Sequence, residues 1–116
     1  ILVITSPLND ENRHSFKLET FQRMKRGSIL INIGRGGIIK ESDLVVALRK
    51  NLIGGVGLDV FEDPRNIPVE LKLDSRVTCT PHIGSANWEA RKAMSDLSVR
   101  AILDSIEGIV PQYIVT

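Results

Sequence analysis

Three apolar runs rich in β-branched residues recur along this chain at an almost constant interval. They cover residues 1–5, 29–33 and 56–60, so that their first residues lie 28 and 27 positions apart, and a fourth run follows at 77–80. This interval fits a βαβ unit, in which a crossover helix joins two parallel strands. Because the runs are nearly continuous in Ile, Leu and Val, they are typical of strands buried on both faces. The sequence therefore predicts an α/β protein built on a parallel sheet.

Apolar residues at helical spacing appear between the runs. They predict crossover helices over 18–24 and 41–48. Gly27 would stop the first helix, while Glu41 and Asp43 fall in the first turn of the second, where the helix dipole favours anions. Both helices would connect neighbouring parallel strands.

Two later segments differ in character. Residues 62–75 contain two prolines and no helical stripe, which predicts an irregular surface segment. From Asn87 an apolar stripe predicts a long helix that Gly108 ends, and we expect this stripe to pack on the chain's own sheet. Trp88 begins that helix and is interpreted as a packing residue.

Length and composition limit the remaining possibilities. With 116 residues the chain holds at most one domain, and because it opens on the strand-like Ile1 we interpret it as cut in mid-domain. Fifteen Lys and Arg against fourteen Asp and Glu leave a net charge of +1, which gives no basic footprint for nucleic acid. No apolar stretch suits a membrane span or a signal peptide. The lone Cys79 suits a reducing compartment, so we expect a cytoplasmic protein without a metal centre.

Polar residues follow the ends of the predicted strands. In an open parallel sheet, ligands bind in the crevice beyond the carboxyl ends of the strands. The segments at those ends are 5–7, 34–37, 62–63 and 81–85. One edge of the sheet is therefore expected to carry Ser, Arg, carboxylate and His side chains.

Three residues at this edge are candidates for chemistry. Arg35 could be an ordinary loop arginine, but the glycines around it would let the backbone approach a ligand, and its planar fork matches a carboxylate. Asp59 lies inside an apolar run and needs a partner, from the protein or a ligand. A lone histidine such as His82 is more often structural, yet a neighbouring carboxylate would stabilise its charged form and make it a general acid near neutral pH. His14, in a charged loop, is interpreted as solvated surface.

Together these motifs resemble the NAD(P)-binding domain of the D-isomer-specific 2-hydroxyacid dehydrogenases. That family includes glyoxylate and hydroxypyruvate reductases, phosphoglycerate dehydrogenase and formate dehydrogenase. The resemblance covers essentially the whole chain and runs, in order, through residues 5–8, 24–27, 31–37, 57–62 and 80–85.

The resemblance implies a role for each residue at the edge. Arg35 would hold the carboxylate and carbonyl of a 2-oxo acid, and His82 would give the carbonyl a proton as hydride arrives from the nicotinamide. A glutamate would orient the histidine. The cofactor, NAD or NADP, would be bordered by Ser6, Pro7, the backbone of Ile33 and Gly34, Arg35, Asp59 on its carboxamide, His82, Gly84 and Ser85.

One position departs from the family pattern. Family members carry the orienting glutamate five residues after the aspartate, and that position here is Pro64. Either Glu62 or Asp63 replaces it, or the histidine has lost its carboxylate. We favour Glu62 for the reach of its side chain, although Asp63 aligns better if one residue was lost.

The dinucleotide fingerprint G-x-G-x-x-G occurs nowhere in the sequence, and the glycines at 54–57 precede a strand instead of opening a helix. The expected fold is therefore the second half of a doubly wound, Rossmann-type parallel sheet. Residues 1–116 would form a partial dinucleotide-binding domain, with 109–116 as a tail that returns to a substrate domain.

The leading hypothesis is an oxidoreductase that reduces a small 2-oxo acid, glyoxylate or hydroxypyruvate, with NADPH or NADH, and that forms a homodimer when full-length. A non-catalytic, NAD-sensing corepressor on the same fold is the alternative, because fold does not fix function. A dimerisation module built on the helix from Asn87 ranks last.

Overall fold

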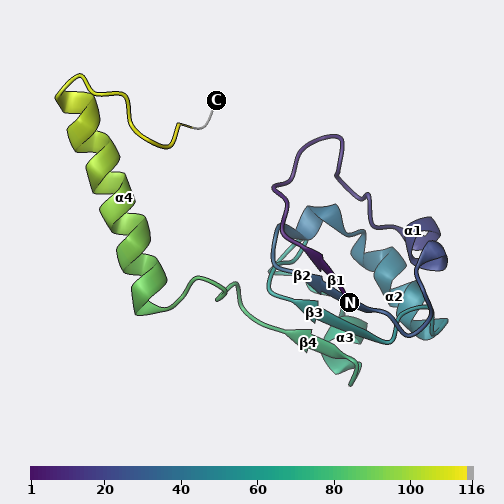
Figure 1. The fold of residues 1–116 in the computed structure, drawn as a ribbon. Coiled ribbons are helices and arrows are strands. Elements are labelled where there is room, and N and C mark those ends of the chain that lie inside the picture. Colours follow the sequence, from purple (N-terminus) through teal and green to yellow (C-terminus); the bar gives the residue numbers. More distant parts are fainter. Residues whose placement is uncertain (115–116) are drawn as a thin grey trace. The chain divides into compact units, whose positions relative to one another are not determined.

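The computed structural model describes residues 1–114, which form two compact units (Figure 1). Residues 1–83 make up the first unit, and the chain from Gly84 onward makes up the second. The first unit contains β1 (Leu2–Ile4), α1 (Leu18–Arg23), β2 (Ile29–Asn32), the 3-10 helix η1 (Gly36–Ile38), α2 (Glu41–Arg49), β3 (Gly55–Leu58), α3 (Val69–Leu73) and β4 (Val77–Cys79). The second contains α4 (Trp88–Ile106).

The four strands form one parallel sheet in the order β1-β2-β3-β4. One row of paired residues crosses the sheet from Leu2 through Leu30 and Val56 to Val77. Each strand is slightly shorter than the run that predicted it, so Asp59 follows the end of β3 instead of lying within it. The predicted α/β fold with a parallel sheet is confirmed.

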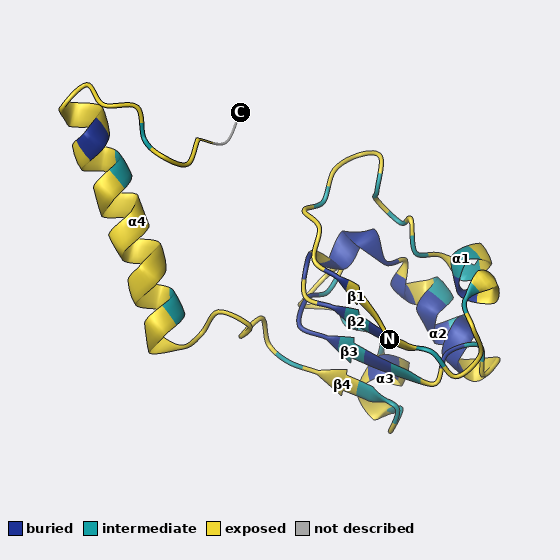
Figure 2. Ribbon diagram, viewed as in Figure 1, coloured by how far each residue is buried: buried dark blue, intermediate teal, exposed yellow. Residues whose placement is uncertain are grey.

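The first unit has its core on one face of the sheet. Leu30, Val56 and Leu58 are at most 3% exposed and belong to one cluster with residues of α1, α2 and α3 (Figure 2). The alternate residues point away from this cluster, and Val3 and Ile29 are 51% and 41% exposed. In the first unit, α1, α2 and α3 all contribute to this one core, so this unit covers one face of the sheet, and burial of the second face stays a prediction.

The two crossover helices lie where helical spacing predicted them. The backbone N–H of Leu18 donates to Asp43 Oδ2 (3.0 Å), so the first turn of α2 caps the beginning of α1. Helix α1 ends at Arg23, well before Gly27, and the predicted stop is wrong. Gly27, with a φ of +76°, instead belongs to the turn that leads into β2.

The segment after β3 is less irregular than its prolines suggested. It contains α3, a helix of five residues that begins directly after Pro68. Leu71 is fully buried and anchors this helix in the core. A helix this short has too few residues for a visible stripe, which explains why the sequence did not predict it.

The second unit confirms the predicted ends of the long helix. Asn87 Oδ1 accepts from the backbone N–H of Ala90 (2.7 Å), which caps the beginning of α4. At the other end Gly108 has a φ of +74°, and Ile109 N–H donates to Asp104 O (2.8 Å), the bond of a Schellman motif. Trp88 is 77% exposed in this unit, and the packing role predicted for it stays a prediction.

The apolar stripe of α4 is exposed as well. Met94, Leu97 and Ile102 are between 53% and 59% exposed, and the packing of the stripe on the sheet stays a prediction. Residues 109–114 continue from the helix, while 115–116 lie outside the described residues, so the predicted return to a substrate domain also stays a prediction. Within residues 1–114, none of the helices combines the length and the apolar character that crossing a bilayer requires.

Candidate active site

Three loops at the carboxyl ends of the strands pack directly on one another through glycines. A Cβ placed on Gly34 would lie 2.6 Å from the carbonyl oxygen of Ser6 in the loop after β1. A Cβ placed on Gly36 would lie 1.9 Å from the carbonyl carbon of Phe61 in the loop after β3. The glycines beside Arg35 therefore allow close approach, as predicted, but the group approached is neighbouring backbone.

These loops border a pocket of about 270 Å³. It brings together three of the predicted site residues, Arg35, Asp59 and His82, which come from three different loops. Apolar side chains supply much of the remaining wall: Val60, Phe61, Pro64, Ile67 and Pro81. The predicted residues Ser6, Pro7, Ile33, Gly34, Glu62 and Asp63 lie outside this lining, and Gly84 and Ser85 belong to the second unit.

The Arg35 side chain is exposed and sparsely bonded. Its Nη1 donates to the carbonyl oxygen of Gly34 (2.8 Å), and no carboxylate among residues 1–114 forms an ion pair with it. Most of the guanidinium fork is therefore available to an anion, which is what recognition of a substrate carboxylate requires.

The carboxylate of Asp59 is bonded within the protein. Asp59 is 8% exposed, and its Oδ1 accepts from the hydroxyl of Thr80 (2.6 Å) and from the backbone N–H of Ile83 (2.8 Å). The predicted need for a partner is thereby confirmed, and the protein supplies it. Both donors belong to the segment that carries His82.

His82 is exposed and has a φ of +57°, in the left-handed region that residues other than glycine rarely adopt. Within residues 1–114, no carboxylate lies within hydrogen-bond distance of its ring. Such backbone conformations recur where the surrounding structure fixes a functional side chain. The structure thus places the histidine on the pocket wall without the carboxylate partner that the sequence led us to expect.

Glu62 has a different partner. Its Oε1 lies 2.5 Å from Nε2 of His14, and its backbone N–H donates to Glu41 Oε1 (2.6 Å). The preference for Glu62 as the partner of His82 is therefore wrong in this conformation, and His14 is a half-buried contact of Glu62 instead of solvated surface. Asp63 Oδ1 accepts from the backbone N–H of Arg65 (3.0 Å), and Asp63 is exposed.

Sequence reasoning placed Glu41 in a first turn but missed its role in the site. Glu41 is 6% exposed, and burial raises the pKa of its carboxyl above the usual value, an effect that the hydrogen bond from Glu62 N–H partly offsets. By accepting from the backbone N–H of Glu62, its carboxyl group fixes the loop after β3. The only available signal was the excess of acidic residues at the start of α2.

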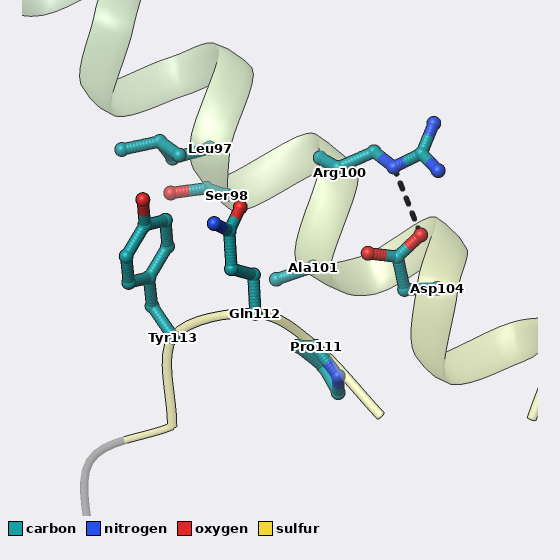
Figure 3. Close-up of a pocket in the computed structure, with 8 residues that line it drawn as sticks. All are labelled: Leu97, Ser98, Arg100, Ala101, Asp104, Pro111, Gln112 and Tyr113. Atoms are coloured by element: carbon teal, nitrogen blue, oxygen red, sulfur yellow. Dashed lines mark ion pairs between the residues drawn. The ribbon is translucent and has the colours of Figure 1, made fainter. Parts of the chain in front are cut away.

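The second unit has a pocket of its own, of about 430 Å³, between α4 and the segment that follows it (Figure 3). Tyr113 and Gln112 face the helix there, and Arg100 Nε lies 2.9 Å from Asp104 Oδ1. None of the predicted site residues lines this pocket. Across residues 1–114, His, Cys, Asp and Glu side chains nowhere gather in threes or more in a way that could hold a metal ion.

Comparisons with known proteins agree with this site. Residues 1–84 match the family model of the D-isomer specific 2-hydroxyacid dehydrogenase, NAD binding domain. Glyoxylate/hydroxypyruvate reductase B of Escherichia coli is 42% identical over 105 residues, which are 90% of this chain and 32% of that protein. The chain thus spans about a third of the length of the curated relatives it matches.

Solved structures share the fold. The NADPH-dependent glyoxylate/hydroxypyruvate reductase of Sinorhizobium meliloti, crystallised with NADP and malonate, aligns with a TM-score of 0.83 and 35% identity over 89% of this chain and 32% of that one. The D-lactate dehydrogenase of Lactobacillus jensenii, crystallised with NAD+, aligns with a TM-score of 0.86 and 25% identity over 98% of this chain and 38% of that one.

Proposed function

The chain belongs to the D-isomer-specific 2-hydroxyacid dehydrogenases and contains part of their NAD-binding domain, and on that basis we propose that the full-length protein reduces a small 2-oxo acid with NADPH or NADH. The observation that carries the proposal is the pocket that Arg35 and His82 both line, with neither side chain in an ion pair within residues 1–114. A cation for the substrate carboxylate and a proton donor for its carbonyl are the two groups this reduction needs from the protein. Relatives named glyoxylate/hydroxypyruvate reductases support glyoxylate or hydroxypyruvate as the substrate.

The residues present fit the nicotinamide end of the cofactor. Ile33 follows β2 with 52% exposure, and Gly34 packs its backbone on Ser6, so an apolar side chain and two loop backbones form one surface at the carboxyl ends of β1 and β2. Ser6 and Pro7 are exposed beside it. When bound there, the cofactor supplies the hydride.

The remaining steps belong to this chain's own side chains. Arg35 binds the carboxylate of the 2-oxo acid and orients its carbonyl. The imidazolium of His82 gives its proton to the carbonyl oxygen as the carbonyl carbon receives the hydride, which yields the 2-hydroxy acid and a neutral histidine. Because the Glu62 carboxylate is bonded to His14, Asp63 is the better candidate for a carboxylate that stabilises the imidazolium.

Kinetics of the full-length protein test this proposal. Arg35→Ala should raise KM for the 2-oxo acid and lower kcat, and His82→Ala should mainly lower kcat, each by about a hundredfold or more, while KM for the nicotinamide cofactor changes little. Arg49→Ala is the control, because Arg49 is exposed on α2 and pairs only with Glu70. Turnover that is unchanged in both site variants contradicts the proposal. Cofactor binding by the wild type without turnover of any 2-oxo acid would favour the corepressor alternative.

The carboxylate partner has its own measurement. A carboxylate that stabilises the His82 imidazolium keeps it protonated to higher pH, so its removal should move the basic limb of the reductive kcat/KM profile to lower pH. We expect Asp63→Asn to move this limb and Glu62→Gln to leave it in place. A limb that neither variant moves would show that the histidine works without either carboxylate.

We also propose a cytoplasmic location and a homodimeric assembly for the full-length protein. The free, exposed Cys79 supports a reducing compartment. Sedimentation analysis of the full-length protein tests the assembly.

A further inference from the structure

A single buried carboxylate oxygen holds the segment that carries His82 at both of its ends. Asp59 Oδ1 accepts from the hydroxyl of Thr80 (2.6 Å), two residues before the histidine, and from the backbone N–H of Ile83 (2.8 Å), directly after it. Thr80 is tied to the sheet as well, because its backbone N–H donates to Leu58 O (2.8 Å). The histidine therefore lies between two fixed points.

The conformation of this segment explains why two fixed points matter. His82 has a φ of +57°, which an L-residue leaves readily unless neighbouring contacts enforce it. Pro81 has no backbone N–H to contribute, and the His82 ring makes no hydrogen bond within residues 1–114. The bonds from Thr80 and Ile83 to Asp59 thus supply a polar contact on each side of the histidine that can hold its backbone in place.

We propose that Thr80 is a positioning residue for His82, acting through its hydroxyl on Asp59. The hydroxyl fixes the beginning of the segment while the Ile83 amide fixes its end, and together they aim the histidine at the pocket it shares with Arg35. Loss of the hydroxyl leaves a buried carboxylate with one donor fewer, and the histidine then samples other orientations. This inference rests on the proposed role of His82 as the proton donor.

Three variants of the full-length protein test it. Thr80→Val keeps the shape of the side chain but removes the hydroxyl, and Thr80→Ser keeps the hydroxyl. Thr78→Val is the matched control, because Thr78 lies on β4 two residues before Thr80, is exposed, and its hydroxyl bonds to nothing within residues 1–114. Thr80→Cys, with a weak donor, gives the same comparison should Thr80→Val not accumulate as a folded protein.

The kinetic constants should show whether Thr80 positions the His82 side chain or only stabilises the folded protein. Because the lost bond is to a charged group, we expect Thr80→Val to lower kcat for the 2-oxo acid about tenfold and to leave KM for the cofactor nearly unchanged. Thr80→Ser should restore kcat to within about twofold, and Thr78→Val should change neither constant. A kcat of Thr80→Val equal to that of the wild type overturns the inference.

A spectroscopic measurement keeps this inference separate from the proposed function. In the protein without substrate, the His82 ring resonances, assigned by their loss in His82→Ala, should shift and broaden in Thr80→Val but not in Thr80→Ser or Thr78→Val. If even the wild type reduces no 2-oxo acid, the proposed function fails, and these resonances still decide whether Thr80 positions the histidine. Thr80→Val with a lowered melting temperature and unchanged His82 resonances would assign Thr80 a purely structural role and overturn the inference.

Discussion

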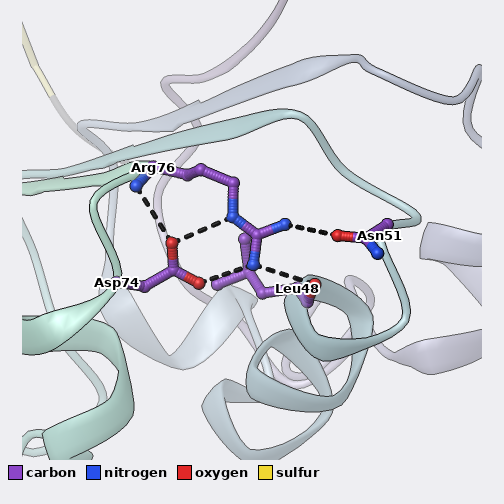
Figure 4. A network of polar contacts seen from close by, with 4 residues as sticks. All are labelled: Leu48, Asn51, Asp74 and Arg76. Atoms are coloured by element: carbon purple, nitrogen blue, oxygen red, sulfur yellow. Dashed lines mark hydrogen bonds and ion pairs between the residues drawn. The ribbon is translucent and has the colours of Figure 1, made fainter.

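Two arginines, one at the amino ends of the parallel strands and one at their carboxyl ends, have very different surroundings. Arg76 directly precedes β4, at the amino end of the strands, and its side chain is enclosed by acceptors (Figure 4). Its Nη1 donates to Asn51 Oδ1 (2.9 Å) and its Nη2 to Leu48 O (2.9 Å), while Nε and Nη2 both bond to Asp74. Within residues 1–114, the side chain of Arg35, at the carboxyl end, donates only to the carbonyl of its neighbour Gly34.

The difference separates a structural arginine, Arg76, from the arginine that we propose to bind substrate, Arg35. Arg76 joins the end of α2 to the beginning of β4, and Nε, Nη1 and Nη2 of its guanidinium all donate to acceptors of the protein. Arg35 is held in place by glycine packing of its backbone, so its guanidinium is left for a ligand. A guanidinium whose N–H groups already bond to the protein cannot bind a substrate carboxylate, whereas one whose N–H groups are largely unused contributes little to folding.

The carboxyl groups of Asp74 and Glu41 differ in the same way between the two ends of the strands. The guanidinium of Arg76 lowers the pKa of Asp74 from 3.8 to about 2 at the amino edge. Burial raises the pKa of Glu41 at the carboxyl edge, beneath the loop of Glu62. At the amino ends of the strands the surroundings therefore stabilise the charged form of Asp74, whereas at the carboxyl ends burial destabilises the charged form of Glu41.

The largest effect is expected where the backbone of the Arg35 loop packs closely on the loop after β3. In Gly36→Ala the new Cβ would lie 1.9 Å from the Phe61 carbonyl carbon, which is backbone and cannot rotate away. We expect a loss of about 3 kcal/mol in the free energy of unfolding, measured by urea denaturation, and a displaced Arg35 loop.

Gly57→Ala is the control for this change. The nearest atoms to its Cβ are side-chain carbons of Ile31 at 3.7 Å, an ordinary contact distance. Its unfolding free energy should change by less than about 1 kcal/mol. Equal stabilities of the two variants would show that the carboxyl edge does not depend on close backbone packing.

A second, intermediate effect tests the structural arginine. Arg76→Ala should lower the melting temperature of the full-length protein and leave kcat and KM unchanged at a temperature where it is folded, the reverse of Arg35→Ala. Arg49→Ala removes an exposed pair with Glu70 and should lower the melting temperature much less. Loss of activity in folded Arg76→Ala would break the division between the two edges.

The sequence predicted the scaffold well because its signals are local and repeated. Apolar runs at a constant interval identified the strands, and Asn87 and Gly108 identified both ends of α4. The five-residue α3 escaped notice because one buried Leu71 makes no period. Burial on both faces was inferred from continuous apolar runs, a pattern that cannot tell which face the residues of this chain cover.

The sequence predicted that Arg35, Asp59 and His82 lie together, but it did not predict which carboxylate pairs with which histidine. Arg35, Asp59 and His82 meet in one pocket because they follow the ends of parallel strands, a consequence of topology that the sequence reveals. The contact of Glu62 with His14 joins residues 48 positions apart, and no local pattern encodes it. Which carboxylate faces which histidine depends on loop conformation, which only the structure provides.

The smallest effect is a pair of opposite pH dependences. Asp74 has a lowered pKa in the folded protein, so its contribution to stability is present above about pH 4 and is lost as the pH falls toward 2. Glu41 has a raised pKa, so the folded protein binds the proton more tightly there, and stability is lost as the pH rises from about 4.5 through that raised value.

Asp74→Asn should therefore flatten the acid limb of the melting temperature against pH, below pH 4. Glu41→Gln, which keeps an oxygen for the N–H of Glu62, should be at least as stable as the wild type at pH 7 and should lose the decline above pH 4.5. Melting curves of the three proteins from pH 2 to 8 measure both effects, and limbs that change in the same direction in the two variants would remove the contrast between the edges.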